Sequence, residues 1–286
     1  MKIEFDNKKK KWVELPNDSS KGVYIDRNLY RKLQNIKTIQ NKGYDCVILI
    51  DGGRREGKSI MAMTCAWILS DCNLTINNFA IGSSSAKEKI NNLPDRSILF
   101  VDEGSAIFSS KDAMKQELKE LIKILDVVGM KEMIFIIVLP SFFDLIKSIA
   151  TRFSRFLLHI YTDNEMNRGR FAYFGTIQKR LLYTIGKKNF DSYRKPTANF
   201  IGRFVDFKVP FYEDYLKLKR ETLLHILESP QKSISNVDRV DVIRELIKNN
   251  QENKNKLTHK QLADLFMSSV RTIQRYIADM RNNGEY

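Results

Sequence analysis

The stretch Gly52-Gly53-Arg54-Arg55-Glu56-Gly57-Lys58-Ser59 lies between an apolar run, Cys46 to Ile50, and a segment of helical periodicity. It matches the pattern G-x-x-x-x-G-K-S, in which the glycines let the backbone curl so that its N–H groups surround phosphate oxygens. Lys58 adds a positive charge, and Ser59 adds a hydroxyl that can bind magnesium. We therefore expect ATP and Mg²⁺ to bind at this stretch. Arg54 and Arg55 either add charge beside the phosphates or face solvent.

A second apolar run, Ile98 to Val101, ends in Asp102 and Glu103. Ligands of open α/β sheets bind outside the carboxyl ends of the strands, so these acids should face the same crevice as the loop. This predicts Asp102 as a magnesium ligand and Glu103 as the general base that polarises the attacking water. The alternative is a pair of acids that only caps the next helix.

A third apolar run, Met133 to Leu139, is followed by Pro140 and Ser141. Ser141 is a polar group where a sensor of the γ-phosphate would lie. Strands also end in serine for capping reasons, so both roles stay open at this point.

Strand and helix patterns alternate from residue 27 to Leu139, which predicts βαβ crossovers and an α/β fold. We expect a RecA-like P-loop NTPase fold with a mainly parallel sheet. Shorter aromatic strands from Phe156 to Ile185, with a turn at Asn167 to Gly169, predict an appended β-hairpin. The expected domains are a polar N-terminal arm at 1–26 with one strand near Trp12 to Leu15, the ATPase domain at 27–227, a linker at 228–236 and a helical domain at 237–286.

The C-terminal segment predicts three helices, the second of which begins with a capping box formed by Thr258 and Gln261. The pattern is typical of a helix-turn-helix domain, a small all-α unit that binds DNA. Its last helix would offer five side chains to a major groove or to flanking phosphates: Ser269, Arg271, Thr272, Gln274 and Arg275. A helical unit used for protein contacts is the alternative.

The formal net charge is +14, and the excess is uneven. The segment Lys147 to Arg220 holds 16 Lys and Arg against 6 Asp and Glu, whereas residues 229–286 hold 10 against 7. Such a basic block predicts a polyanion partner, since Lys and Arg contacts to phosphate drive binding that is independent of sequence. A basic surface that is simply solvated is the alternative.

No apolar run approaches the roughly 18 residues of a membrane span, and the N-terminus lacks the apolar core of a signal peptide. The three cysteines, Cys46, Cys65 and Cys72, show no zinc-binding spacing and are expected as buried free thiols. These features predict a cytoplasmic protein without a membrane span.

The order of GGRREGKS, ILFVDEG and IIVLPSFFDL, followed by a basic segment and an aromatic hairpin, resembles the zonular-occludens-toxin-like branch of the HerA and FtsK P-loop ATPases, carried by mobile elements. The first two motifs occur in many additional-strand, catalytic-glutamate ATPases. The resemblance implies ATP-driven work on DNA by a homo-oligomer, such as a hexameric ring, in which an arginine completes the neighbour's site. The helix before the third strand ends in Lys131 where that arginine is expected, so Arg152 and Arg155 are the candidates; a DNA-facing or surface role for them is the alternative.

Three functions follow from these features. The leading one is a motor or DNA-remodelling ATPase of a plasmid, virus or integrative element. The second is an ATP-switched helix-turn-helix regulator of transcription or replication with little motor activity. A P-loop kinase fits less well, because the adjacent acids Asp102 and Glu103 suit the activation of water and no arginine-rich lid is evident.

Overall fold

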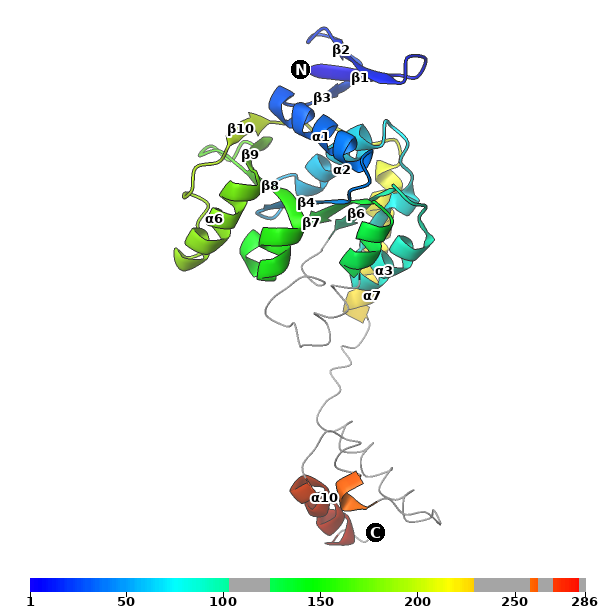
Figure 1. The fold of residues 1–286 in the computed structure, drawn as a ribbon, viewed down its shortest axis with the longest axis vertical. Helices are drawn as coiled ribbons and strands as arrows, with labels where there is room; N and C mark the ends of the chain where they lie inside the picture. The colour runs from blue at the N-terminus through cyan, green and yellow to red at the C-terminus, as the bar shows by residue number, and fades with distance from the viewer. Residues whose placement is uncertain (103–123, 229–257, 262–269, 283–286) are drawn as a thin grey trace. The chain divides into compact units, whose positions relative to one another are not determined.

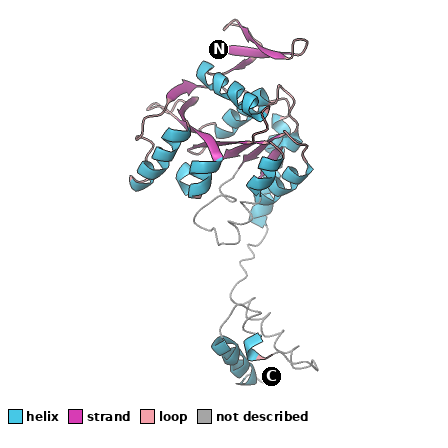
Figure 2. Ribbon diagram, viewed as in Figure 1, coloured by secondary structure: helices cyan, strands magenta, loops and turns pink. Residues whose placement is uncertain are grey.

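The computed structural model of the chain describes residues 1–102, 124–228, 258–261 and 270–282. They belong to two units, Met1–Thr222 and Leu223–Tyr286. Figure 1 follows the first unit from its blue N-terminal strands to the yellow helix α7, and Figure 2 shows that helices flank a central set of strands.

A seven-stranded sheet forms the centre of the first unit, in the order β10-β9-β8-β4-β7-β6-β5. The five strands from β8 to β5 are parallel, and β9 and β10 continue the sheet in antiparallel pairing. The strands are β4 (Cys46–Gly52), β5 (Phe79–Ile81), β6 (Ile98–Asp102), β7 (Ile134–Val138), β8 (Ser154–Tyr161), β9 (Arg170–Phe174) and β10 (Phe200–Arg203). The expected α/β fold with a mainly parallel sheet and an appended hairpin is therefore confirmed.

Strands β4, β6 and β7 are buried along their whole length, which explains why they appear in the sequence as continuous apolar runs. Helices α1 (Arg27–Gln40) and α2 (Lys58–Leu69) share one core with one face of the sheet. Helices α3 (Gly82–Asn92) and α6 (Thr176–Lys188) contact the strands with the other core. Figure 1 shows the two layers on opposite sides of the strands.

Strand β7 lies between β4 and β6, although it follows both in the sequence. Because the strands are parallel, the carboxyl ends of β4, β6 and β7 share one edge of the sheet. The loop at 52–59, Asp102 and Ser141 follow these ends.

Residues 1–26 form more structure than the polar arm with one strand expected from the sequence. They make a three-stranded antiparallel sheet of β1 (Lys2–Asp6), β2 (Lys11–Leu15) and β3 (Val23–Tyr24), in the order β2-β1-β3. Ile3, Val23 and Ile25 are buried in the core that α1 and α2 share. The segment thus belongs to the first unit, and β2 is the strand that the sequence indicated.

The aromatic hairpin is shorter than expected. Strands β8 and β9 pair in antiparallel fashion as predicted, but Thr176–Lys188 is the helix α6 and not a further strand. Its buried stripe consists of Lys179, Leu182, Tyr183 and Gly186, a helical spacing that begins with a charged residue. Because Lys179 is not apolar, the buried face of α6 does not appear as an apolar periodicity in the sequence.

Helix α7 (Tyr212–Glu228) crosses the boundary between the units at Thr222. Most of the linker expected at 228–236 lies outside the described residues. In the second unit, α10 (Val270–Asn282) has Ile273 and Ile277 buried. Thr258 and Gln261 exchange the expected capping contacts, with N–O distances of 2.9 and 3.3 Å. No helix within the described ranges is long and apolar enough to cross a membrane.

Candidate active site

The backbone of the loop at 52–59 is tightly curled, as its glycines allow. Gly52 and Gly57 have φ angles of 143° and 100°, in the region that favours glycine. A Cβ atom at Gly52 would lie 2.3 Å from the carbonyl oxygen of Ile160, so no larger residue fits there without backbone movement. Gly57 is also the N-cap of α2 and provides no side chain, which leaves the first N–H groups of the helix for a ligand.

Lys58 and Glu56 contact the loop backbone. The ammonium group of Lys58 donates to the carbonyl oxygens of Gly52 and Gly53 at 2.8 and 2.5 Å. The N–H of Gly53 donates to the Glu56 carboxylate at 2.5 Å, which is the kind of amide-to-anion contact that phosphate oxygens make. The loop therefore presents both a cation and an anion-binding amide. Arg54 and Arg55 are exposed.

Asp102 is the centre of the polar contacts at this edge of the sheet and is only 2% exposed. Its Oδ2 atom accepts a hydrogen bond from Ser59 Oγ at 3.2 Å. Mg²⁺ prefers six oxygen ligands at 2.0–2.1 Å, which places neighbouring ligand oxygens about 3 Å apart. The two oxygens predicted as metal ligands thus have the chemistry and the spacing that Mg²⁺ requires.

Helix α7 adds two contacts to Asp102 that the sequence did not indicate. Lys219 Nζ lies 2.6 Å from Asp102 Oδ2, and the Tyr215 hydroxyl donates to the same oxygen. Burial and the neighbouring carboxylate raise the pKa of Tyr215, so it stays a donor. The only sequence signal is the i, i+4 spacing of Tyr215 and Lys219, which places both on one helix face.

A second polar cluster surrounds Asp51, which is fully buried one residue before the loop. Its carboxylate accepts from the backbone N–H of Phe142 at 2.8 Å and from the Tyr193 hydroxyl. His159 Nδ1 lies 3.0 Å from the other oxygen, and the imidazole stacks on Tyr193 with 3.6 Å between ring centroids. These contacts tie the segment after β7 and the loop around Tyr193 to the start of the phosphate-binding loop.

Ser141 lies close to the nucleotide edge but has a capping role in this structure. Its hydroxyl accepts from the N–H of Phe143 at 3.2 Å at the start of η2 (Phe142–Asp144). The residue after β7 is still bonded to β4 near the loop, since Leu139 N donates to Ile50 O at 2.9 Å. A sensor role for Ser141 stays a prediction, as does the role of Glu103, which lies outside the described residues.

The two candidate arginines lie at the other end of the sheet. Arg152 is in the π-helix η3 (Ile149–Phe153) and Arg155 is the second residue of β8; both are exposed. In the pairing of β8 with β4, Ser154 lies opposite Val47, whereas Ile160 lies opposite Gly52. Arg155 is therefore five residues, roughly 16 Å, from the level of the nucleotide loop.

Of the residues predicted to contact DNA, Arg271, Gln274 and Arg275 are exposed on α10. Arg271 and Arg275 lie on the side away from the buried Ile273 and Ile277. Ser269 and the side chain of Thr272 lie outside what the structure describes.

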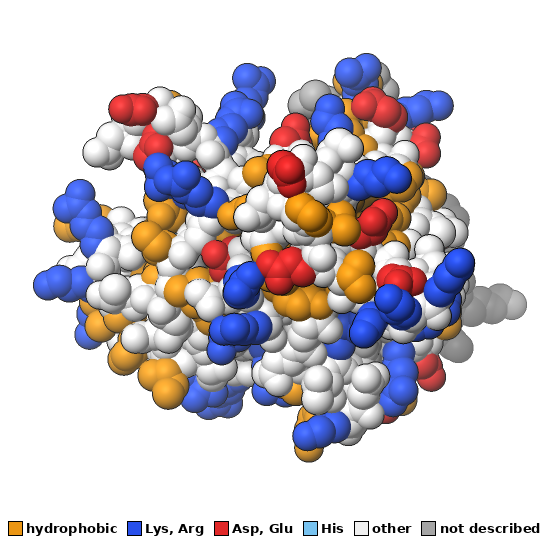
Figure 3. All heavy atoms as spheres, turned by 90° about the horizontal axis from the view of Figure 1, so that it is seen from above, with side chains coloured by type: hydrophobic (Ala, Val, Ile, Leu, Met, Phe, Trp, Pro, Cys, Tyr) orange, Lys and Arg blue, Asp and Glu red, His pale blue; other side chains and the backbone are white. Residues whose placement is uncertain are grey.

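Part of the basic block is used inside the fold. Lys179 is buried and donates to Ser154 O at 2.6 Å, Arg170 pairs with Asp163 at 2.9 Å, and Lys219 pairs with Asp102. The charge available to a polyanion is thus smaller than the sequence count indicates. Figure 3 shows blue Lys and Arg side chains spread over one face of the molecule, with red carboxylates among them.

Solved structures similar to this chain include a viral NTPase and a domain of zonular occludens toxin, the family that the sequence resembles. The genome packaging NTPase B204 from Sulfolobus turreted icosahedral virus 2, in complex with ATP-gammaS, is 11% identical over 47% of this chain and 94% of its own, with a TM-score of 0.35. The N-terminal domain of zonular occludens toxin from Neisseria meningitidis is 14% identical over 60% and 98%, with a TM-score of 0.39. No protein-family model and no curated protein sequence matches the chain. The assignment of the fold rests on the strand order and on the loop between β4 and α2.

Proposed function

We propose that this chain binds Mg²⁺ and ATP at residues 52–59 and hydrolyses the ATP while it acts on DNA. The observation that carries the proposal is the 3.2 Å contact between Ser59 and Asp102 beside Lys58, at the carboxyl ends of β4 and β6. A serine hydroxyl, a buried carboxylate and a lysine at one edge of a parallel sheet form the set that holds a metal-bound triphosphate.

Each residue of the proposed site has a separate task. Lys58 neutralises charge on the β- and γ-phosphates, and Ser59 and Asp102 would hold Mg²⁺, which supplies further charge neutralisation when bound. Glu103 directly follows β6 and would accept the proton of the attacking water, so that the water oxygen bonds to the γ-phosphorus as the bond to ADP breaks. Ser141 would contact the γ-phosphate.

The proposed association with DNA is supported by charge and by the exposed face of α10. The chain carries a net charge of +14, and Arg271, Gln274 and Arg275 are exposed on one helix. Gln and Arg are side chains that bind base edges and phosphates. The setting in a plasmid, virus or integrative element is part of this proposal and rests on the resemblance of the sequence motifs.

The proposed homo-oligomer, such as a hexameric ring, follows from the position of Arg152 and Arg155. Because both lie at the end of β8 away from the loop, neither can complete the nucleotide site of its own chain. An arginine from this region acts on ATP only if a neighbouring copy presents it.

The position of α7 favours a second function, an ATP-switched regulator. Tyr215 and Lys219 contact Asp102, and the same helix continues past Thr222 into the second unit. A change in the contacts of Asp102 could therefore act on the helix that leads to the proposed DNA-binding residues. Slow hydrolysis that DNA does not change would favour this function over a motor.

The test compares Lys58→Ala with Lys42→Ala, which removes an exposed lysine that precedes β4, at the opposite end of this strand from the loop. We expect ATP affinity to fall strongly in Lys58→Ala only, because that lysine faces the phosphates. The hydrolysis rate is then measured with and without duplex DNA, and the mass of the wild-type protein with and without nucleotide. Undiminished ATP binding by Lys58→Ala would contradict the assignment of the site.

A further inference from the structure

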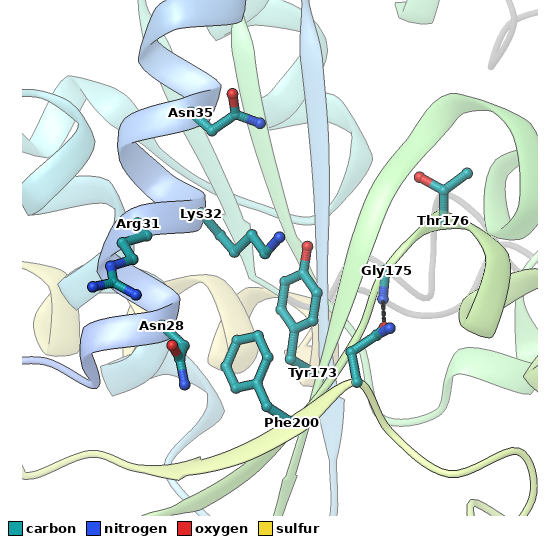
Figure 4. A pocket seen from close by; sticks show the side chains of 9 residues that line it. Asn28, Arg31, Lys32, Asn35, Tyr173, Gly175, Thr176 and Phe200 are labelled. Carbon is teal, nitrogen blue, oxygen red and sulfur yellow. Dashed lines mark hydrogen bonds between the residues drawn. The ribbon is translucent and has the colours of Figure 1, made fainter.

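An open pocket of about 700 Å³ lies outside the nucleotide site, between α1 and the turn that joins β9 to α6. None of its lining residues belongs to the loop at 52–59. Figure 4 shows its walls, with side chains of α1 on one side and Tyr173, Gly175 and Thr176 on the other. The following contacts show which class of ligand it suits.

The wall formed by α1 consists of Asn28, Arg31, Lys32 and Asn35. The spacing i, i+3, i+4, i+7 places these four exposed side chains on one face of the helix, while Leu29, Leu33 and Ile36 are buried on another face. From Asn28 to Asn35 the row extends about 10 Å, since it covers seven steps of 1.5 Å. The helix therefore presents two cations flanked by two amides in a straight row.

The cations of this row have no carboxylate partner among the described residues. No Asp or Glu lines the pocket, and no ion pair involves Arg31 or Lys32 in the described part of the chain. In contrast, the nearby Arg27 pairs with Glu14 at 2.7 Å and Lys37 pairs with Asp71. The two charges that face the pocket are thus the unneutralised ones of α1.

The opposite wall adds polar groups and an aromatic floor. Lys32 Nζ lies 5.9 Å from the centre of the Tyr173 ring, and Tyr173 stacks on Phe200 at 4.6 Å. Asn199 accepts from Gly175 N at 2.7 Å, the dashed contact in Figure 4. Thr176, at the start of α6, donates to the backbone carbonyl of Arg155 at 3.1 Å, so the exposed Arg155 lies beside this wall.

We propose that this pocket holds the phosphodiester backbone of a nucleic-acid strand, with Arg31 and Lys32 as its phosphate contacts. The proposal rests on the DNA association proposed above and adds a contact site in the first unit, separate from α10. A single small anion is best held by cations that converge on a point. Here cations and amides are spread over about 10 Å, which corresponds to about three nucleotides at 3.4 Å per step.

The test uses the full-length chain and two double variants that each remove two positive charges. Arg31→Gln with Lys32→Gln changes the pocket, and Lys21→Gln with Lys42→Gln is the control, since both of its lysines are exposed outside the pocket. Binding to labelled single-stranded and duplex oligonucleotides is measured at several salt concentrations. Melting temperatures establish that both variants fold, and the unchanged second unit contributes equally to each.

We expect the pocket variant to bind DNA about tenfold more weakly at low salt, and the slope of log K against log salt to fall by about 1–2. The control should lose less than twofold. Asn35→Lys, which adds a third positive charge to the row, should bind a few fold more tightly. All three proteins should bind ATP like the wild type.

Equal losses in the pocket variant and the control would overturn the proposal. The proposal would also be overturned if the pocket variant kept the salt slope of the wild type and lost affinity for inorganic phosphate as much as for DNA, because that result describes a site for a single anion. If the wild-type chain binds no nucleic acid, the proposed DNA association fails as well. If the wild type binds DNA and the pocket variant loses no more affinity than the control does, the proposed DNA association stands and the pocket is not the site of binding.

Discussion

Replacing Lys219 with methionine tests the link between α7 and Asp102. Lys219 Nζ lies 2.6 Å from Asp102 Oδ2, and the side chains are 26% and 3% exposed. Breaking a fully buried ion pair costs about 3–5 kcal/mol. Because the lysine is partly exposed and Asp102 keeps its bonds to Ser59 and Tyr215, we expect Lys219→Met to lower the free energy of unfolding by about 1–3 kcal/mol.

Magnesium and ATP should narrow this difference. The ammonium of Lys219 and the hydroxyl of Ser59 contact the same carboxylate oxygen, at which Asp102 would bind the metal. Without Lys219, the carboxylate is a stronger ligand, so Lys219→Met should gain more thermal stability from Mg²⁺ and ATP than the wild type does.

The assay is the melting temperature with and without Mg²⁺ and ATP. A loss of 1–3 kcal/mol corresponds to a fall of about 2–12 °C for a unit of this size. Lys217→Met is the matched control, since this lysine lies on the same helix and is exposed. A Lys219→Met protein as stable as the control, or a difference that Mg²⁺ and ATP leave unchanged, would refute the reasoning.

Three further predictions follow. Burial lowers the pKa of Lys179 from 10.5 to about 7, with a smaller effect of Arg180, so the unfolded chain binds the proton of this ammonium group more tightly than the folded chain does. In urea unfolding, the wild type should therefore gain stability relative to Lys179→Met as the pH rises from about 7 to 10.5. Stability profiles of the two proteins that stay parallel over this pH range would contradict the pKa shift. Glu103→Gln should keep ATP affinity and lose hydrolysis by about a hundredfold or more, whereas an active variant would place the base elsewhere. A mixture of the Arg152→Ala, Arg155→Ala protein with the Lys58→Ala protein should hydrolyse ATP although neither protein does so alone, because a mixed interface joins an intact loop to an intact arginine. If the subunits exchange and the mixture stays inactive, these arginines do not act on the ATP of a neighbouring chain.

The elements that sequence predicts best are those whose burial is complete. Strands β4, β6 and β7 are buried on both faces, so every position must be apolar or small, and the runs are visible without knowledge of their partners. The loop at 52–59 was equally visible, because its glycines and lysine meet a local backbone requirement. Ser59 and Asp102 were predicted to meet because parallel strands end at one edge, and the structure places them in contact.

Sequence reasoning missed contacts that depend on distant parts of the chain. Lys219 and Asp102 are 117 residues apart, and Tyr193 and Asp51 are 142 apart. Each side chain alone is compatible with an exposed surface, so only the packing of the whole unit brings the pairs together. The helix α6 was missed for a related reason, since Lys179 is buried through hydrogen bonds to Ser154 and not through apolar character.

The parallel sheet separates two kinds of charge chemistry by the length of a strand. Lys58 and the Asp102 carboxylate lie at the carboxyl ends of the strands, whereas Arg155 and the pocket wall at Thr176 lie near the start of β8. The guanidinium group of Arg155, near the start of β8, cannot bind DNA in the pocket and a neighbour's γ-phosphate at the same time. If the arginines complete a neighbour's site, the pocket variant should bind DNA weakly and keep its rate of ATP hydrolysis without DNA, and the mixture of the Arg152→Ala, Arg155→Ala protein with Lys58→Ala should regain hydrolysis. If they bind DNA instead, loss of Arg155 should reduce DNA affinity together with Arg31 and Lys32, and the mixtures should stay inactive. The DNA-binding and mixing experiments thus distinguish two arrangements. In one, neighbouring chains share nucleotide sites; in the other, each chain hydrolyses ATP alone and binds DNA at the opposite end of its sheet.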